Sequence, residues 1–559
     1  MNIAVNQVGY RPEMVKRATM RIGDTVSISD SYDTKNVCSL SEKDYGETYI
    51  LDANTKEKIY KITSCRVKES EYASEVCVEL DFTEFKADGK YILSNDKYGE
   101  SYPFEIGKNV YDSLLKDVMR MFYLQRCGCR LEEKYAGKYA HKECHNTKAR
   151  IYGTDDFIDV TGGWHDAGDY GRYIVAAAKA VVDLMMAYEY YTDIFEKDID
   201  ISESGNGIPD ILDEVRYELK WMLKMQREDG AVYHKVTCAG FPGFIMPELE
   251  TEELIVSPVS DAATADFAAS MAHAYRVYSN LSKRYGEVAK EYEKDALEYL
   301  EAAKKAMSFL DNNSAGEFLN PDGIVTGEYG NDQTIDEMFW AAAEMFNATG
   351  EEKYEEKLKA INLDEVPGEL SWKEVGDYGF MAYLSAAAKD EDLEKSVYKR
   401  LKEEAEEKLI KVSKDPYGSS IYGYYYWGCN MEMANDAIRG AFLDRYENNN
   451  SNHNYELSQM QLSYLLGNNP LGKSFITGHG SNSPINPHHR PSAAMKEAMP
   501  GMLVGGPEPL LLDDIAKKML KDIPPAKCYL DELDSYSTNE ITIYWNSPFV
   551  FLLASIISK

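Results

Sequence analysis

The apolar pattern changes once along this chain of 559 residues, close to residue 108. Before that point short segments alternate apolar and polar residues, as at 18–22 and 76–82, with breaks rich in Gly, Asp and Asn. Alternation with a period of two is typical of strands that bury one face. We therefore predict a small antiparallel β-sandwich over residues 1–107, with its last strand at 102–106.

Beyond residue 108 the apolar residues recur at i, i+3 and i+4, which is typical of helices with one buried face. About a dozen helices fit into residues 108–559, and many are rich in alanine. The clearest lie at 111–125, 173–191, 208–226, 262–278, 292–310, 336–346, 378–388 and 455–466. The charged run 402–411 indicates a solvated helix face. Long loops between these segments contain most of the Gly, Pro, His and Trp residues, so functional residues are expected there.

The charge of the chain excludes two classes of partner. Its formal net charge is −33, which would repel nucleic acid and an anionic membrane surface. The longest apolar run, 549–557, is too short to span a bilayer. We therefore expect neither nucleic acid nor a membrane as partner, and we expect a monomer.

The first residues and the cysteines bear on the cellular compartment. No basic stretch and no apolar stretch of the secretory type follow Met1, so a cytoplasmic protein is expected unless an export signal has been removed. The nine cysteines are odd in number and dispersed, which favours reduced thiols, some of them on a metal.

The segment 159–173, which reads DVTGGWHDAGDYGRY, contains the strongest catalytic signal. Asp166 and Asp169 lie three residues apart across an Ala-Gly pair, and Trp164 and Tyr170 supply flat apolar faces. Two carboxylates beside aromatic residues suit the activation of water next to a sugar. A polar turn that caps the following helix is the alternative. It explains one aspartate but not the Gly-Gly-Trp that precedes it.

Two further clusters lie near the C-terminus. Glu540 immediately precedes the apolar helix predicted at 541–557, where burial would raise its pKa into the range of a general acid. A helix-start glutamate that interacts with the helix dipole is the alternative. The second cluster, Pro-His-His-Arg at 487–490, carries two imidazoles and a guanidinium that can hydrogen-bond to hydroxyls. Trp427, in an aromatic run, suits either a sugar-stacking platform or core packing.

Together these segments resemble the signatures of glycoside hydrolase family 9, the inverting cellulases with an (α/α)6 six-hairpin barrel. The residues at 5–12 resemble the start of the immunoglobulin-like domain that precedes the barrel in one branch of the family. The resemblance implies an all-β immunoglobulin-like domain at 1–107 and an all-α barrel at 108–559. It also implies roles for the matching residues: Asp169 as base, Asp166 as holder of the water, Glu540 as acid and Asp531 as its companion carboxylate. His488 and Arg490 would contact the sugar at the cleavage subsite, and Tyr536, part of the same signature as Glu540, would bind substrate.

The same branch is known for a structural zinc, and the matching ligands are Cys127, Cys144, His145 and His165. Two thiolates and two imidazoles suit a closed tetrahedral zinc site. Cys129 is a possible competitor, and ordinary buried thiols are the alternative. Calcium is possible at Asp210, Asp213 and Glu214, which equally suit the first turn of a helix. No organic cofactor is expected.

The resemblance implies hydrolysis of β-1,4-glucosidic bonds in cellulose-type glucans or cello-oligosaccharides by inversion, as in an endo-β-1,4-glucanase. An exo-acting cellodextrinase, a β-glucosidase or a glucosaminidase on the same fold are alternatives. A glycan-binding protein without activity is a third class, but it would be expected to have lost Asp169 or Glu540, and both are present.

Overall fold

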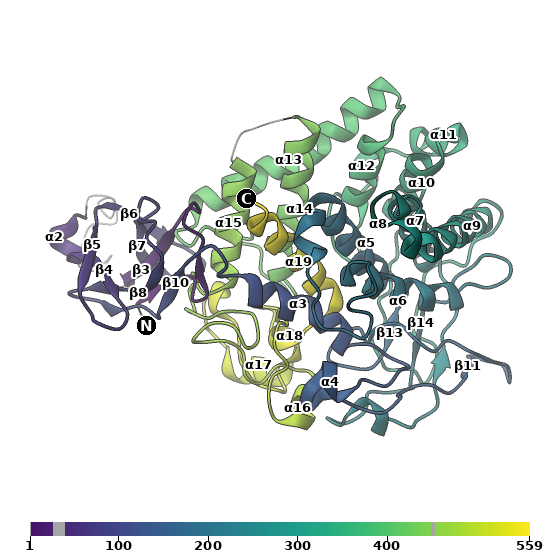
Figure 1. The fold of residues 1–559 in the computed structure, drawn as a ribbon, viewed down its shortest axis with the longest axis horizontal. Coiled ribbons are helices and arrows are strands. Elements are labelled where there is room, and N and C mark those ends of the chain that lie inside the picture. Colours follow the sequence, from purple (N-terminus) through teal and green to yellow (C-terminus); the bar gives the residue numbers. More distant parts are fainter. Residues whose placement is uncertain (1, 26–39, 449–452) are drawn as a thin grey trace.

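The computed structural model describes residues 2–25, 40–448 and 453–559, in which a small β domain lies beside a large helical domain (Figure 1). The β domain contains two sheets, ordered β1-β3-β7-β6 and β2-β10-β8-β4-β5, with β9 paired to β8. The strands are β1 Ile3–Ala4, β2 Gly9–Tyr10, β3 Arg17–Asp24, β4 Thr48–Asp52, β5 Lys58–Ile62, β6 Ser64–Ser70, β7 Glu75–Asp81, β8 Gly89–Asn95, β9 Gly99–Glu100 and β10 Phe104–Ile106. Tyr10, Phe82 and Phe104 pack together inside the sandwich, with ring centroids 5.4–5.7 Å apart. The predicted β-sandwich is confirmed.

Six helices of the large domain pack in a closed ring, in the order α5, α7, α10, α12, α14 and α19. They are α5 Ile174–Tyr191, α7 Asp261–Tyr278, α10 Ile335–Thr349, α12 Gly376–Ser385, α14 Asn430–Tyr446 and α19 Ile543–Ile557. Most side chains of α5 and α7 are buried on every face, as expected for helices surrounded by protein. Their many alanines allow the close approach. The predicted (α/α)6 barrel is confirmed.

An outer set of helices covers this ring: α3 Asp112–Leu124, α6 Asp210–Lys224, α9 Lys290–Asn312, α11 Glu352–Ala360, α13 Glu391–Lys414 and α15 His453–Leu465. These helices have one buried and one exposed face. The charged run 402–411 lies within α13, whose buried side chains include Val397, Leu401 and Ala405. No helix in the described part of the chain is long and apolar enough to cross a membrane.

A small five-stranded sheet is an element that the apolar pattern does not predict. Its order is β12-β11-β15-β14-β13, and its strands are β11 Ala149–Ile151, β12 Phe157–Ile158, β13 Arg172–Tyr173, β14 Lys235–Thr237 and β15 Ile255–Val256. Strands of two or three residues are too short to show a period. This sheet holds the loops around the predicted catalytic segment, because β13 directly follows Gly171.

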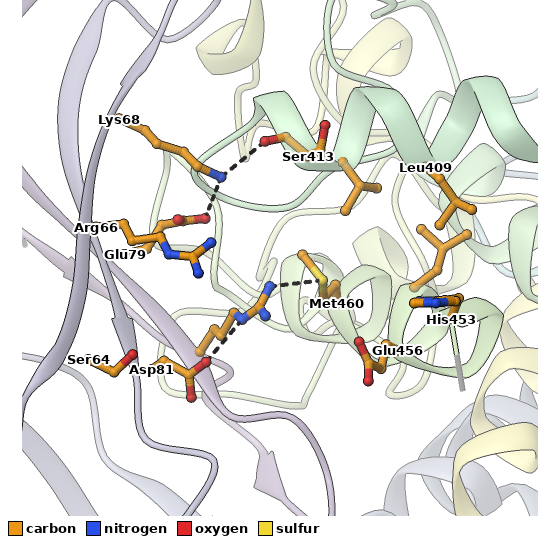
Figure 2. A pocket seen from close by; sticks show the side chains of 13 residues that line it. Ser64, Arg66, Lys68, Glu79, Asp81, Leu409, Ser413, His453, Glu456 and Met460 are labelled. Atoms are coloured by element: carbon orange, nitrogen blue, oxygen red, sulfur yellow. Dashed lines mark hydrogen bonds and ion pairs between the residues drawn. The ribbon is translucent and has the colours of Figure 1, made fainter. Parts of the chain in front are cut away.

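The two domains meet where β3, β6 and β7 face α13 and α15, around a pocket of about 290 Å³ (Figure 2). Lys68 pairs with Glu79 at 2.9 Å and donates to the Ser413 carbonyl across the boundary. Tyr417 of the helical domain donates to buried Glu75 at 2.6 Å. Polar contacts therefore hold the sandwich against the barrel. The pocket between the two domains and the cleft described below are lined by different residues.

Candidate active site

A cleft of about 950 Å³ brings together seven of the predicted site residues. They are Asp166, Asp169, Trp427, His488, Arg490, Tyr536 and Glu540. These residues come from loops and helix ends that are far apart in the sequence. A concave site of this size, lined by aromatic side chains with a few polar groups, is typical of a small-molecule or oligosaccharide site.

The loop that carries both aspartates is held by hydrogen bonds to its backbone. Gln125 Nε2 donates to the carbonyls of His165 and Ala167, and the Asp166 N–H donates to the Gly171 carbonyl. A Cβ on Gly168 would lie 2.1 Å from the His488 carbonyl oxygen. Only glycine therefore allows this loop to lie against the segment that contains His488.

Each aspartate is anchored by a tyrosine. Tyr329 donates to Asp166 Oδ2 at 2.6 Å, and Tyr173 donates to Asp169 Oδ2 at 3.1 Å. Burial, and then the charge of Asp169, raise the pKa of Asp166 well above its usual value. Oδ1 of Asp166 is buried and has no partner among the described residues. The pair therefore keeps carboxyl oxygens available to orient a water molecule.

Glu540 lies between α18 (Tyr536–Asn539) and α19, whose N-cap is Thr542. It therefore stands outside the first turn of α19, and the helix-dipole alternative does not describe it. Burial, and then the charges of Asp169 and Asp166, raise the pKa of Glu540 well above its usual value. A raised pKa lets a carboxyl group hold its proton to higher pH than a free glutamate does, which suits a general acid.

The His-x-Arg element has a more structural role than the sequence indicates. His488 Nδ1 donates to the Leu533 carbonyl at 2.6 Å, and burial lowers the pKa of its imidazole. A neutral ring with Nδ1 protonated leaves Nε2 as an acceptor for a sugar hydroxyl. Arg490 donates through Nε to the Pro242 carbonyl and through Nη1 to the Gly168 carbonyl. Arg490 therefore uses two of its N–H groups to tie together the loops that contain Pro242 and Gly168.

Trp427 and Tyr536 form an aromatic platform on the cleft. Their ring centroids are 5.4 Å apart, and they are 39 % and 36 % exposed. Such exposure excludes the core-packing alternative for Trp427. Pyranose rings stack on surfaces of this kind through their C–H faces.

Asp531, predicted as a catalytic carboxylate, does not line the cleft. Its carboxylate accepts hydrogen bonds from the N–H groups of Ile485 and Asn486 and pairs with Lys473 at 3.0 Å. Asp531 therefore holds the loop that leads to His488, and its position does not support a direct catalytic role.

Several site residues carry no local signal in the sequence. Tyr173 and Tyr329 anchor the two aspartates, while Trp372 lies 4.8 Å from the Tyr329 ring and lines the cleft. His489 Nε2 donates to Gln125 Oε1 at 3.0 Å and its Nδ1 accepts from the Ser492 hydroxyl, so His489 fixes the glutamine that holds the catalytic loop. The chain has 42 tyrosines, so their type alone does not distinguish these positions.

The four predicted zinc ligands form one buried cluster. The donor atoms of Cys127, Cys144, His145 and His165 all lie within 4.8 Å of one another. His165 Nε2 is 3.4 Å from His145 Nδ1 and 3.8 Å from Cys144 Sγ. Cys129 is not in this group, which removes the predicted competition. Two sulfur and two nitrogen donors at these separations fit a closed tetrahedral metal site.

The three carboxylates considered for calcium do not share a site. Asp210 accepts from the Ile199 N–H and from Ser204, and Asp213 accepts from Tyr292. Glu214 pairs with Arg126 at 2.8 Å. Each group has its own protein partner, so the structure lends no support to calcium at these residues.

The barrel and its acidic, aromatic cleft define the class of the protein as a glycoside hydrolase. More narrowly, the chain belongs to glycoside hydrolase family 9, because the model of glycosyl hydrolase family 9 matches residues 111–553. A model of the cellulase N-terminal Ig-like domain matches residues 1–100.

Relatives of known name support this assignment. A cellodextrinase of Butyrivibrio fibrisolvens is 38 % identical over 87 % of this chain and 91 % of its own length. Endoglucanase D of Acetivibrio thermocellus is 34 % identical over 100 % of this chain and 83 % of its own length. Among solved structures, AaCel9A in complex with cellobiose-like isofagomine has a TM-score of 0.89, 33 % identity and full coverage of both chains. A Zn-binding triple mutant of the family 9 endoglucanase J30 has a TM-score of 0.86 and 31 % identity, with 98 % of this chain and 99 % of that chain covered.

Proposed function

We propose that this protein hydrolyses β-1,4-glucosidic bonds in cellulose-type glucans and cello-oligosaccharides by a single displacement with inversion. One observation carries the proposal: a single cleft contains Asp169, anchored through one oxygen, and Glu540, whose pKa is raised. These are the base and the acid that such a displacement needs.

In the proposed reaction Asp166 and Asp169 orient a water molecule beside the anomeric carbon. Asp169 takes a proton from this water while its oxygen bonds to the anomeric carbon. The bond from that carbon to the glycosidic oxygen breaks, and Glu540 gives its proton to the leaving oxygen. Nε2 of His488 accepts a hydrogen bond from a hydroxyl of the sugar at the cleavage point.

The aromatic platform of Trp427 and Tyr536 supports a glucan as substrate. We propose endo action on soluble chains, which agrees with the endoglucanases among the similar proteins. Exo action on cello-oligosaccharides is the second candidate, favoured by the identity to the cellodextrinase. The products of cellohexaose labelled at its reducing end separate the two, since exo action releases one product size from one end. Chitosan oligomers and mixed-linkage glucan test the glucosaminidase alternative and the breadth of specificity.

The stereochemistry of the product tests the mechanism. An inverting site holds its two carboxyl groups about 6.5–9.5 Å apart, with water between them and the sugar. Proton NMR of the first products should therefore show the α-anomer from a β-linked substrate. Initial β-anomer would indicate a covalent intermediate and contradict the role of Asp169 as base.

We also propose that Cys127, Cys144, His145 and His165 hold one zinc ion. The buried N/S donor set supports this, and so does the Zn-binding mutant among the similar structures. The ion would have a structural role, since all four of its positions are taken by protein. It would brace His165, the residue directly before Asp166.

A further inference from the structure

The segment 239–250 forms part of the cleft wall beside the catalytic residues. Phe241 lines the cleft, and the ring of Phe244 lies 5.5 Å from that of His488. Both phenylalanines are exposed, at 51 % and 37 %. In this segment the Pro242 carbonyl accepts from Arg490, and the Ile245 carbonyl accepts from Tyr170. The segment therefore presents apolar side chains to substrate while its backbone is tied to the catalytic loops.

The end of this segment is tied to the Cys/His cluster by one side chain. Glu250 Oε2 lies 2.9 Å from Nε2 of His145, and the two side chains are only 4 % and 2 % exposed. The other nitrogen of the same ring, Nδ1, faces His165 Nε2 at 3.4 Å. A single imidazole thus contacts the donor cluster through one nitrogen and the cleft segment through the other.

The chemistry of a metal-bound imidazole makes this contact directional. When Nδ1 binds a metal, Nε2 must carry the proton and donate it, and a carboxylate acceptor then fixes the plane of the ring. The backbone of His145 has a φ of +46°, a conformation that residues other than glycine rarely adopt unless their surroundings hold them. A metal on Nδ1 permits only the tautomer whose Nε2 donates to Glu250, so loss of the metal removes this constraint on the ring.

We propose that Glu250 is a positioning residue that couples the metal site to the wall of the substrate cleft. Metal binding orders His145, His145 holds Glu250, and Glu250 holds the end of the segment that presents Phe241 and Phe244. This coupling rests on the zinc assignment and the hydrolase activity proposed above. Loss of the metal or of the Glu250 carboxylate therefore weakens substrate binding more than it slows the chemical step.

Hydrogen–deuterium exchange of peptides from 239–250, without substrate, tests the coupling independently of activity. Four samples are compared: the zinc-loaded wild type, the wild type treated with dipicolinate, and Glu250→Ala with and without the same chelator. We expect chelation to increase exchange of this segment at least several-fold in the wild type. In Glu250→Ala exchange should be high already and should rise little further on chelation. Equal increases in both proteins, or no change in either, would overturn the proposal.

Metal retention and kinetics complete the test. In competition with the chelator Glu250→Ala should bind zinc about tenfold more weakly than the wild type, as expected when the acceptor of a metal-bound histidine is removed. It should also raise the KM for cellohexaose several-fold at nearly constant kcat. Glu250→Gln keeps an acceptor and should recover most of both properties; it also serves if the alanine variant fails to fold. Glu252→Ala is the matched control, because Glu252 is exposed and its side chain has no hydrogen bond among the described residues.

A fall in kcat with unchanged KM would contradict the proposed role of Glu250. If neither wild type nor variant hydrolysed glucans, the hydrolase assignment would fail, whereas the exchange result would still decide the coupling. If the wild type bound no zinc at all, the metal assignment and the coupling would both fail.

Discussion

Two clusters of ionisable groups meet between His165 and Asp166, and they are built in opposite ways. In the first, Cys127, Cys144, His145 and His165 direct their donor atoms at one another inside the protein. In the second, the carboxyl groups of Asp166, Asp169 and Glu540 face a shared cleft and are anchored at its edge by tyrosine hydroxyls and backbone groups.

The two clusters differ in their effect on the stability of the folded protein. A metal that binds a closed donor set of the folded state lowers the free energy of that state, so it raises the free energy of unfolding. The carboxyl cluster instead contains two groups, Asp166 and Glu540, whose pKa values are raised by burial and by nearby negative charge. Such perturbed groups are common at catalytic sites and cost stability at neutral pH.

The largest loss of activity is expected from Asp169→Ala, in the carboxyl cluster of the cleft. In the proposed mechanism Asp166 only orients the water and Asp169 takes its proton, so kcat should fall by about 10⁴-fold on every substrate. Initial rates on cellohexaose and on an aryl cellobioside measure this. Asp155→Asn is the control, because Asp155 is exposed on the segment that leads to the same loop. Activity within tenfold of the wild type would remove Asp169 from the mechanism.

Glu540→Gln should have a smaller effect that depends on the leaving group. We expect a loss of about 10³-fold on cellohexaose but less than about tenfold on a dinitrophenyl cellobioside, whose leaving group needs little protonation. Because the raised pKa lets Glu540 hold its proton to higher pH, kcat/KM of the wild type should fall as the pH rises through that pKa. The variant should lose this alkaline limb. Equal losses on both substrates would argue against Glu540 as the acid.

Removal of one donor from the Cys/His cluster should cost the protein its metal and part of its stability. Purified wild type should contain about one zinc per chain, Cys144→Ser almost none, and Cys129→Ser the normal amount. The melting temperature of Cys144→Ser should fall by several degrees, because binding energy that favours the folded state is lost. Elemental analysis and calorimetry measure both. Fully active, metal-free wild type would leave these cysteines as ordinary buried thiols.

Asp166→Asn tests whether the carboxyl cluster lowers the stability of the protein, because loss of this buried carboxylate should then stabilise it. The folded pKa of Asp166 lies above its unfolded value. Between these values the folded state binds more protons, so the stability contribution is complete below the unfolded pKa and is lost as the pH rises. Asparagine keeps an acceptor for Tyr329 without the charge. The melting temperature should approach that of the wild type as the pH falls below the unfolded pKa, and exceed it by about 1–3 °C at pH 8. A lower value at pH 8 would show that the charge of Asp166 is compensated in the folded protein.

The sequence by itself determined the parts of this protein that depend on near neighbours in the chain. Periodicity is a local property, so the predicted helix at 173–191 agrees with α5 and that at 262–278 with α7 to within one residue. The Asp166–Asp169 pair is equally local, because a loop of four residues must place both carboxylates on one side of the barrel.

Only the tertiary structure decided which distant groups meet. Tyr329 reaches Asp166 across 163 residues, and Glu250 reaches His145 across 105. The same holds for the exclusion of Cys129 from the donor cluster and for the placement of Asp531 behind the His488 loop. The short strands β11 to β15 pair only because the barrel brings their loops together. No pattern within a segment encodes such contacts, since they depend on how the closed ring of helices orients its loops.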